Sequence, residues 1–167
     1  GGGTMGRGIA MCFANSNIPV KIIETDQQKL ELALEGVEKT YSKMVASGRI
    51  NDTQRQQRLK QISGSCDHAS LTQADLVVEA AFEDLGVKKS IFSSLDQHCK
   101  PEAILATNTS YLDIEAIASA VNDPSRVLGM HFFSPAHIMK LLEVVYTPQT
   151  ATVAIATMMK LGKKLRK

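Results

Sequence analysis

The sequence predicts an α/β fold in which strands and helices alternate along the chain. Short apolar runs such as IPVKIIETD (18–26) and ADLVVEAAF (74–82) are separated by longer segments of helical periodicity. Three spaced glycines stand directly before the first helical segment. Two late apolar runs, at 126–133 and 140–146, lie close together. We therefore expect a doubly wound, mostly parallel sheet with an antiparallel strand near the end.

The first half of the chain contains three expected helices. Residues 5–15 place Met5, Ile9 and Phe13 on one face, which indicates an amphipathic helix. A long amphipathic segment covers about 27–47 and ends at SGRIND. The next helix is expected to reach about residue 61, with Asp52 or Thr53 as its N-cap.

The second half repeats the alternation of strand and helix. The run at 74–82 is nearly continuous in apolar residues, which predicts a strand buried on both faces. Asp113 is placed to open a short helix. The remaining expected elements are a helix at 84–99, strands at 103–108, 126–133 and 140–146, and a last helix at 150–166.

Composition excludes several classes of function. The 167 residues are 44% hydrophobic and carry a formal net charge of +2, which is too small to indicate a nucleic-acid partner. No apolar run approaches the roughly 20 residues that span a membrane. No signal-peptide pattern is visible, but this absence excludes nothing, because we expect the chain to lack its first strand. The three cysteines are far apart and include no C-x-x-C, so we expect reduced thiols.

The opening GGGTMGRGIA fits the dinucleotide-binding pattern G-x-G-x-x-G at Gly1, Gly3 and Gly6. A helix follows at once, and its free N–H groups suit a pyrophosphate. Glu24 ends the next strand, where a carboxylate accepts ribose hydroxyls and disfavours a 2′-phosphate, so NAD is the expected cofactor. A buried strand normally precedes the first glycine, so we expect the chain to lack its first strand. A structural glycine turn beside an unrelated surface glutamate is the alternative.

A histidine and a glutamate interrupt the apolar stretch GMHFFSPAHIMKLLEVV (129–145). In an antiparallel pair of strands centred near residue 137, His131 and Glu143 lie opposite each other. The carboxylate then holds one imidazole nitrogen and leaves the other to move a proton. A core histidine with an unrelated edge glutamate is the alternative from spacing alone. No compact zinc motif is present, and we expect no metal.

Four motifs together resemble the NAD-binding domain of L-3-hydroxyacyl-CoA dehydrogenases, in order and in spacing. They are GGGTMGRGIA, LVVEAAFED, LATNTSYLDI and GMHFFSPAHIMKLLEV. The likeness is greatest to the dehydrogenase part of peroxisomal-type bifunctional enzymes, and it covers essentially the whole chain. It implies a Rossmann-like fold and NAD-dependent oxidation of (3S)-3-hydroxyacyl-CoA to 3-ketoacyl-CoA in fatty-acid β-oxidation. A non-catalytic, crystallin-like relative and a short-chain 3-hydroxybutyryl-CoA dehydrogenase are the alternatives.

The resemblance also implies roles for individual residues. His131 matches the catalytic acid/base, Glu143 the carboxylate that orients it, and Ser110 the hydroxyl that bonds the substrate's 3-oxygen. Thr40 matches a hydroxyl offered to coenzyme A, and Lys43 is a weak substitute for a lysine of the family. The implied NAD contacts are Gly1, Gly3, Met5, Gly6, Glu24, Ala81, Glu83, Lys88, Asn108, Ser110 and Ser134, the last at a position where the family often has Asn.

The family pattern continues beyond residue 167 with a helical domain that closes over the acyl-CoA and forms a dimer. We therefore expect residues 1–167 to be one NAD-binding domain from a longer, homodimeric protein, inactive when isolated. An acyl-CoA thioester is the expected partner, with no nucleic acid or membrane. The resemblance implies a peroxisomal location, and the reduced cysteines suit the cytoplasm equally.

Overall fold

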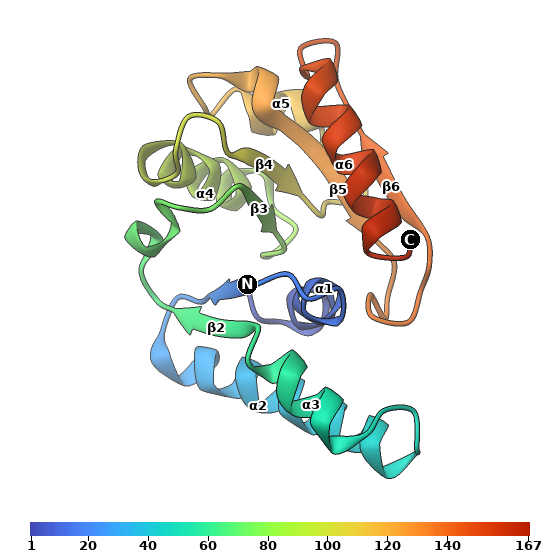
Figure 1. Ribbon diagram of the computed structural model, residues 1–167. Coiled ribbons are helices and arrows are strands. Elements are labelled where there is room, and N and C mark those ends of the chain that lie inside the picture. The colour runs from blue at the N-terminus through green and yellow to red at the C-terminus, as the bar shows by residue number, and fades with distance from the viewer. The chain divides into compact units, whose positions relative to one another are not determined.

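The protein is described by a computed structural model that covers all 167 residues, and it divides into two compact units (Figure 1). The first unit comprises residues 1–67 and 134–139, and the second comprises 68–133 and 140–167. Strands and helices alternate through both, which confirms the expected α/β class. No helix has both the length and the apolar composition needed to cross a bilayer.

The first unit contains a two-stranded parallel sheet and three helices. Its elements are α1 (Thr4–Asn15), β1 (Val20–Ile23), α2 (Gln27–Ala46), α3 (Asp52–Leu59) and β2 (Ile62–Ser65). The core is formed where Leu30, Val37 and Tyr41 of α2 meet Met11 and Ile22. The buried Tyr41 hydroxyl donates to Asn15 Oδ1 at the end of α1 (3.0 Å), so α1 and α2 are also joined by a polar contact.

Two local features of this unit differ from expectation. Strand β2 has the sequence ISGS, whose polar and glycine residues carry no strand pattern. It forms because it pairs in parallel with β1, with Val20 opposite Ile62. The cap of α3 is Asn51 rather than Asp52 or Thr53, because Asn51 and Gln54 bond each other's backbone in a capping box.

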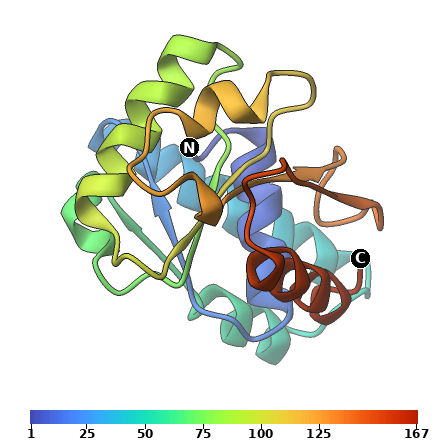
Figure 2. The same cartoon turned by 90° about the horizontal axis from the view of Figure 1, so that it is seen from above.

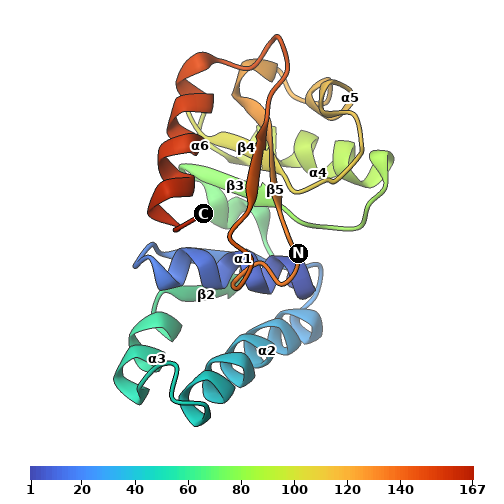
Figure 3. The same ribbon diagram turned by 90° about the vertical axis from the view of Figure 1, so that its right-hand side faces the viewer.

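The second unit contains a four-stranded sheet in the order β3-β4-β5-β6. Strands β3, β4 and β5 are parallel and β6 is antiparallel to β5, as expected. Helices α4 and α5 lie together on one face and α6 on the other (Figures 2 and 3). The elements are η1 (His68–Leu71), β3 (Leu76–Glu79), α4 (Leu85–His98), β4 (Ile104–Thr107), α5 (Ile114–Ala118), η2 (Pro124–Arg126), β5 (Val127–Phe132), β6 (Leu142–Val145) and α6 (Thr152–Lys164).

The topology of the second unit brings chemistry-bearing residues to one edge of its sheet. Glu79 and Thr107 end β3 and β4, and they pair across the ladder. His131 lies near the end of β5 and faces Glu143 of the antiparallel β6. Strand β3 is less buried than expected, because Leu76 to Val78 are half-buried and only Glu79 is fully covered. The covered position of β3 is therefore a charged one.

Candidate active site

The N-terminus of α1 carries the glycines of the expected nucleotide-binding turn. Gly3 is the N-cap of this helix, in extended backbone geometry and without a side-chain cap. The first-turn N–H groups of α1 thus have no side-chain acceptor, which suits an anionic ligand. A Cβ added to Gly3 would meet no protein atom within 4 Å, so the space beside this glycine is open.

Gly2, which lies between the fingerprint glycines, is the position where the protein itself requires glycine. A Cβ there would come within 2.4 Å of the Ala33 Cβ. The Gly2 N–H donates to Glu24 Oε1 (2.5 Å), and Glu24 Oε2 accepts from the Thr25 N–H (3.1 Å). The expected carboxylate is thus held beside the glycine turn by two backbone donors. The fingerprint pattern missed Gly2, whose only sequence signal is its place in a run of three consecutive glycines.

The segment 134–139, which includes Ser134, packs on α1. A Cβ at Gly8 would lie 3.1 Å from the Ala136 Cβ, and Cys12 Sγ lies 3.2 Å from the Ala136 carbonyl oxygen. The Ser134–Pro135 bond is cis, and Ser134 is exposed. Gly8 was also missed, because it falls after the fingerprint glycines inside a helical pattern.

The residues expected to contact coenzyme A, Thr40 and Lys43, lie on α2. The half-buried Thr40 hydroxyl donates to the Gly36 carbonyl oxygen (2.8 Å), and Lys43 is exposed one turn further on. The side chain of Arg7, from α1, lies against this turn of α2. A Cβ added to Gly36 would lie only 2.0 Å from Arg7 Nη1. A basic side chain that the sequence pattern did not single out, that of Arg7, thus lies against Gly36, one turn before Thr40.

In the second unit, His131 and Glu143 form the pair that the spacing predicts. They are register partners, and His131 Nδ1 lies 2.8 Å from Glu143 Oε2. The His131 side chain is 20% exposed and Glu143 is 51% exposed, so the pair is reachable from solvent. The Nε2 atom of His131 makes no hydrogen bond within the chain. The imidazole is thus anchored at one nitrogen and available at the other.

The loop after β4 carries Ser110 and is tied to β5. Asn108 Oδ1 accepts from the Phe132 N–H (2.8 Å), which joins this loop to the strand of His131. Ser110 is exposed, and its backbone N–H donates to Glu83 Oε1 (3.0 Å). Its hydroxyl makes no hydrogen bond within the chain, so it is available to a ligand. The fold therefore brings three expected residues, Asn108, Ser110 and His131, to one edge of the sheet.

Glu83 and Lys88 are joined to this loop, but Lys88 is not a surface residue. Lys88 is only 1% exposed, and its Nζ lies 2.9 Å from Glu79 and 3.1 Å from Glu83. Partial burial raises the pKa of Glu83, but bonds from Thr109, Ser110 and Lys88 outweigh it and hold the pKa below its ordinary value. Ala81, another expected cofactor contact, donates its N–H to Glu79 Oε1 (2.6 Å).

Glu79 is the main residue of this edge that sequence reasoning missed. Its signal was the same as that of Glu143, a carboxylate inside an apolar strand-like run. His68 and His98 are half-buried and both bond Ser94. No three His, Cys, Asp or Glu side chains gather closely enough to hold a metal ion.

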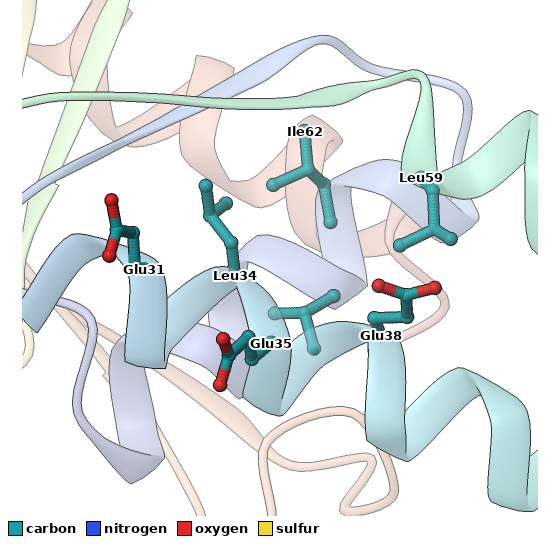
Figure 4. Close-up of a pocket in the computed structure, with 7 residues that line it drawn as sticks. Glu31, Leu34, Glu35, Glu38, Leu59 and Ile62 are labelled. Carbon is teal, nitrogen blue, oxygen red and sulfur yellow. The ribbon is translucent and has the colours of Figure 1, made fainter. Parts of the chain in front are cut away.

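Two hollows of the surface lie away from the expected site residues. In the first unit, a groove of about 360 Å³ runs along α2 (Figure 4). Its apolar floor is rimmed by Glu31, Glu35 and Glu38, whose negative charge is unsuited to the phosphates of NAD or coenzyme A. In the second unit, a hollow of about 460 Å³ includes Asp75 and Arg126 near the amino ends of the strands.

Comparison with known proteins decides the family. The model of the 3-hydroxyacyl-CoA dehydrogenase NAD-binding domain matches residues 1–167, the whole chain. The chain belongs to this family. The 3-hydroxyacyl-CoA dehydrogenase resemblance read from the motifs is confirmed, as is NAD as the cofactor of the domain.

Individual relatives of this 3-hydroxyacyl-CoA dehydrogenase domain agree. A peroxisomal bifunctional enzyme of Cavia porcellus is 46% identical over 99% of the chain and 23% of its own length. A peroxisomal fatty acid β-oxidation multifunctional protein of Arabidopsis thaliana is 37% identical over 100% of the chain and 23% of its own length. The solved structure of 3-hydroxybutyryl-CoA dehydrogenase from Escherichia coli matches with a TM-score of 0.97 and 38% identity, over 100% of this chain and 35% of that one.

The dehydrogenase domain thus spans about a quarter of the length of these curated relatives. The bifunctional and multifunctional activities in their names belong to those whole proteins. For this chain, the comparisons show the family, the fold and the NAD-binding character of the domain.

Proposed function

We propose that the protein containing this domain catalyses the reversible, NAD-dependent oxidation of (3S)-3-hydroxyacyl-CoA to 3-ketoacyl-CoA. The observation that carries this proposal is the His131–Glu143 pair, joined at 2.8 Å in a domain of the matching family. An imidazole held by a carboxylate at one nitrogen and open at the other is arranged for acid–base chemistry.

The roles of the residues follow from their bonds. With Nδ1–H donated to Glu143, the lone pair on His131 Nε2 takes the proton from the substrate's 3-hydroxyl. Glu143 stabilises the imidazolium that forms. The unbonded hydroxyl of Ser110 donates to the 3-oxygen and keeps it near His131. Bound NAD supplies the acceptor for the hydride that leaves C3.

The residues around the glycine turn fit NAD. In the first unit we assign Gly1, Gly3, Met5 and Gly6 to the pyrophosphate, because the first-turn N–H groups of α1 have no side-chain cap and Gly3 leaves open space. Glu24, held by the Gly2 N–H, is assigned to the adenosine ribose. The further contacts assigned to the nicotinamide half are Ser134 of the first unit and Ala81, Glu83, Asn108 and Ser110 of the second. Lys88, whose ammonium group is buried, is assigned to this half through its bond to Glu83.

The test is NADH production by the complete protein with (3S)-3-hydroxyacyl-CoA, beside NADH-binding titrations. His131→Ala should lower turnover by about 10²–10⁴-fold, because an acid–base group is lost, and leave NADH affinity nearly unchanged. His98→Ala is the matched control, since His98 is also half-buried but bonds only Ser94. Loss of NADH binding with turnover retained would contradict the assignment. Tight binding without turnover in the wild type would favour the non-catalytic alternative.

Two substrate classes, which differ in acyl chain length, are candidates for this reaction. The TM-score of 0.97 to a 3-hydroxybutyryl-CoA dehydrogenase favours a short-chain substrate, whereas the multifunctional relatives favour general β-oxidation. We propose general β-oxidation for the parent protein, because the sequence identity to the bifunctional enzymes is higher, at 46% against 38%. Comparing kcat/KM for C4 and C10 substrates separates the two, and a strong preference for C4 would overturn this choice.

We also propose that Thr40 and Lys43 contact coenzyme A and that the protein acts in peroxisomes as a homodimer. The acyl-CoA assignment follows from the family, and the location from the peroxisomal relatives.

Imaging of the tagged complete protein tests the location, and a cytoplasmic signal would contradict it. Sedimentation of the complete protein tests the dimer.

A further inference from the structure

The second unit buries a charged cluster that the assigned roles do not explain. Glu79 at the end of β3 has a side chain only 2% exposed, and that of Lys88 in α4 is 1% exposed. Burying two charges is costly, and an apolar pair of similar size is often at least as stable. The stability of the sheet therefore does not account for this cluster by itself.

The Glu79 carboxylate is fully bonded. Both of its oxygens lie 2.9 Å from Lys88 Nζ. Oε1 also accepts from the Ala81 N–H (2.6 Å), and Oε2 from the Thr107 hydroxyl (2.7 Å). Glu79 thus fixes the start of the loop after β3, the end of β4 and the lysine of α4 at one point.

From Lys88 the bonds continue to the loop of Ser110. Lys88 Nζ also contacts Glu83 Oε2 (3.1 Å), so this ammonium group is shared between two carboxylates. The other Glu83 oxygen accepts from the Thr109 hydroxyl and from the Ser110 N–H. The hydroxyl oxygen of Thr109 accepts from the Leu112 N–H (3.0 Å), which closes the turn.

We propose that Glu79 is a positioning residue of the dehydrogenase site, which holds Lys88 so that Lys88 holds Glu83 and Glu83 fixes the backbone of Ser110. The inference rests on the proposed function, because it concerns the residue that holds the substrate's oxygen. Lys88 contributes through its carboxylate partners, since its ammonium is buried and directed to Glu79 and Glu83. Ser110 keeps its own hydroxyl unbonded while its backbone is fixed.

The sheet offers a matched control for the loss of a buried ion pair. Arg126 Nη2 bonds Asp96 Oδ1 at 2.5 Å, with exposed fractions of 8% and 9%. Arg126 directly precedes β5, so this pair lies at the amino ends of the strands, whereas Ser110 lies at their carboxyl ends. Asp96→Asn therefore removes a comparable buried charge without touching the loop of Ser110.

The experiment compares Glu79→Gln with Asp96→Asn in the complete protein, by kcat, melting temperature and hydrogen exchange at the Ser110 amide. Both variants should melt earlier, but only Glu79→Gln should lower kcat, on the order of 10²-fold. Only Glu79→Gln should speed exchange of the Ser110 amide, on the order of tenfold. Equal loss of kcat in both variants would overturn the proposal, because stability alone would then explain it.

A double variant separates positioning from stability. Lys88→Met leaves Glu79 as an unpaired buried charge, and adding Glu79→Gln removes that charge, so the melting temperature should recover while kcat stays low. Recovery of both the melting temperature and kcat would show that the Glu79–Lys88 ion pair is only structural. Hydrogen exchange does not depend on turnover, so unchanged Ser110 exchange in Glu79→Gln overturns the positioning role by itself. Faster exchange with an inactive wild type would instead overturn the proposed function and leave the positioning contact supported.

Discussion

A buried ion pair lies near each end of the parallel strands of the four-stranded sheet, one at their amino ends and one at their carboxyl ends. The two pairs make different further bonds. At the edge where β3 to β5 begin, Arg126 bonds Asp96 and two main-chain carbonyl oxygens, those of Lys100 and Ala103. At the edge where these strands end, Lys88 joins Glu79 to Glu83, and the bonds continue to the loop of Ser110.

This difference separates a structural use of buried charge from a functional one. The guanidinium of Arg126 satisfies carbonyl oxygens of a connecting segment, which holds that segment against the start of β5. The ammonium of Lys88 instead orients a carboxylate that holds the backbone of a proposed substrate-binding residue. The buried charge at one end of the sheet thus bonds a connecting segment, and the buried charge at the other end bonds the loop whose positioning we propose.

The largest expected effect on stability comes from Arg126→Met. It leaves Asp96 without its counter-charge in a nearly buried site and removes the donor from two carbonyl oxygens. We expect a loss of roughly 3–5 kcal/mol in the free energy of unfolding. Urea denaturation measures this loss, and kcat per folded molecule should stay unchanged. A large fall in kcat would mean that the two edges are not separate in function.

Glu143→Gln should lower turnover and leave stability nearly unchanged, the reverse of what we expect for Arg126→Met. The His131–Glu143 pair is substantially exposed, so its loss should change the melting temperature very little. Turnover should fall on the order of 10²-fold, because the imidazole of His131 is no longer oriented for proton transfer from the substrate's hydroxyl. Steady-state kinetics and thermal unfolding of one preparation test this. Wild-type turnover in this variant would remove Glu143 from the mechanism.

The smallest expected effect is a pH dependence at Glu83. Its pKa is lowered in the folded protein, so its contribution to stability is present above the unfolded pKa, near 4.5, and is lost as the pH falls through the folded pKa. The free energy of unfolding should therefore fall less steeply between pH 6 and pH 3 in Glu83→Gln than in the wild type. Urea titrations across this range measure the slopes.

Asp123 provides the control for this titration at the other edge. Bonds from the side chain and backbone N–H of Ser125 lower its pKa also. Asp123→Asn should flatten the acid slope without changing Ser110 exchange, whereas Glu83→Gln should change both. Identical exchange in the two variants would show that Glu83 does not hold the loop.

Much of the candidate active site was predictable because its signals are local. The pairing of His131 with Glu143 follows from two charges placed symmetrically in apolar runs, and the register confirms it. The proximity of Glu24 to the glycine turn follows from the spacing of one strand–helix–strand unit, and the bond to the Gly2 N–H bears this out.

Other residues were unpredictable because their environment comes from distant parts of the chain. Lys88 has the sequence context of a surface helix lysine, and only the packing of α4 beside β3 buries it. Strand β2 has no β-type composition, and it exists because β1 offers it a parallel edge. Gly2 is obligatory because Ala33 of α2 lies against it.

The sequence by itself thus determined the α/β alternation, the family and the pairing of His131 with Glu143. Each of these depends on periodicity, spacing or symmetry over short stretches of chain. Only the tertiary structure decided which charges are buried and what they hold. Burial and pairing depend on which elements meet, and a carboxylate such as Glu79 acquires its role from the lysine and hydroxyl that the fold brings to it.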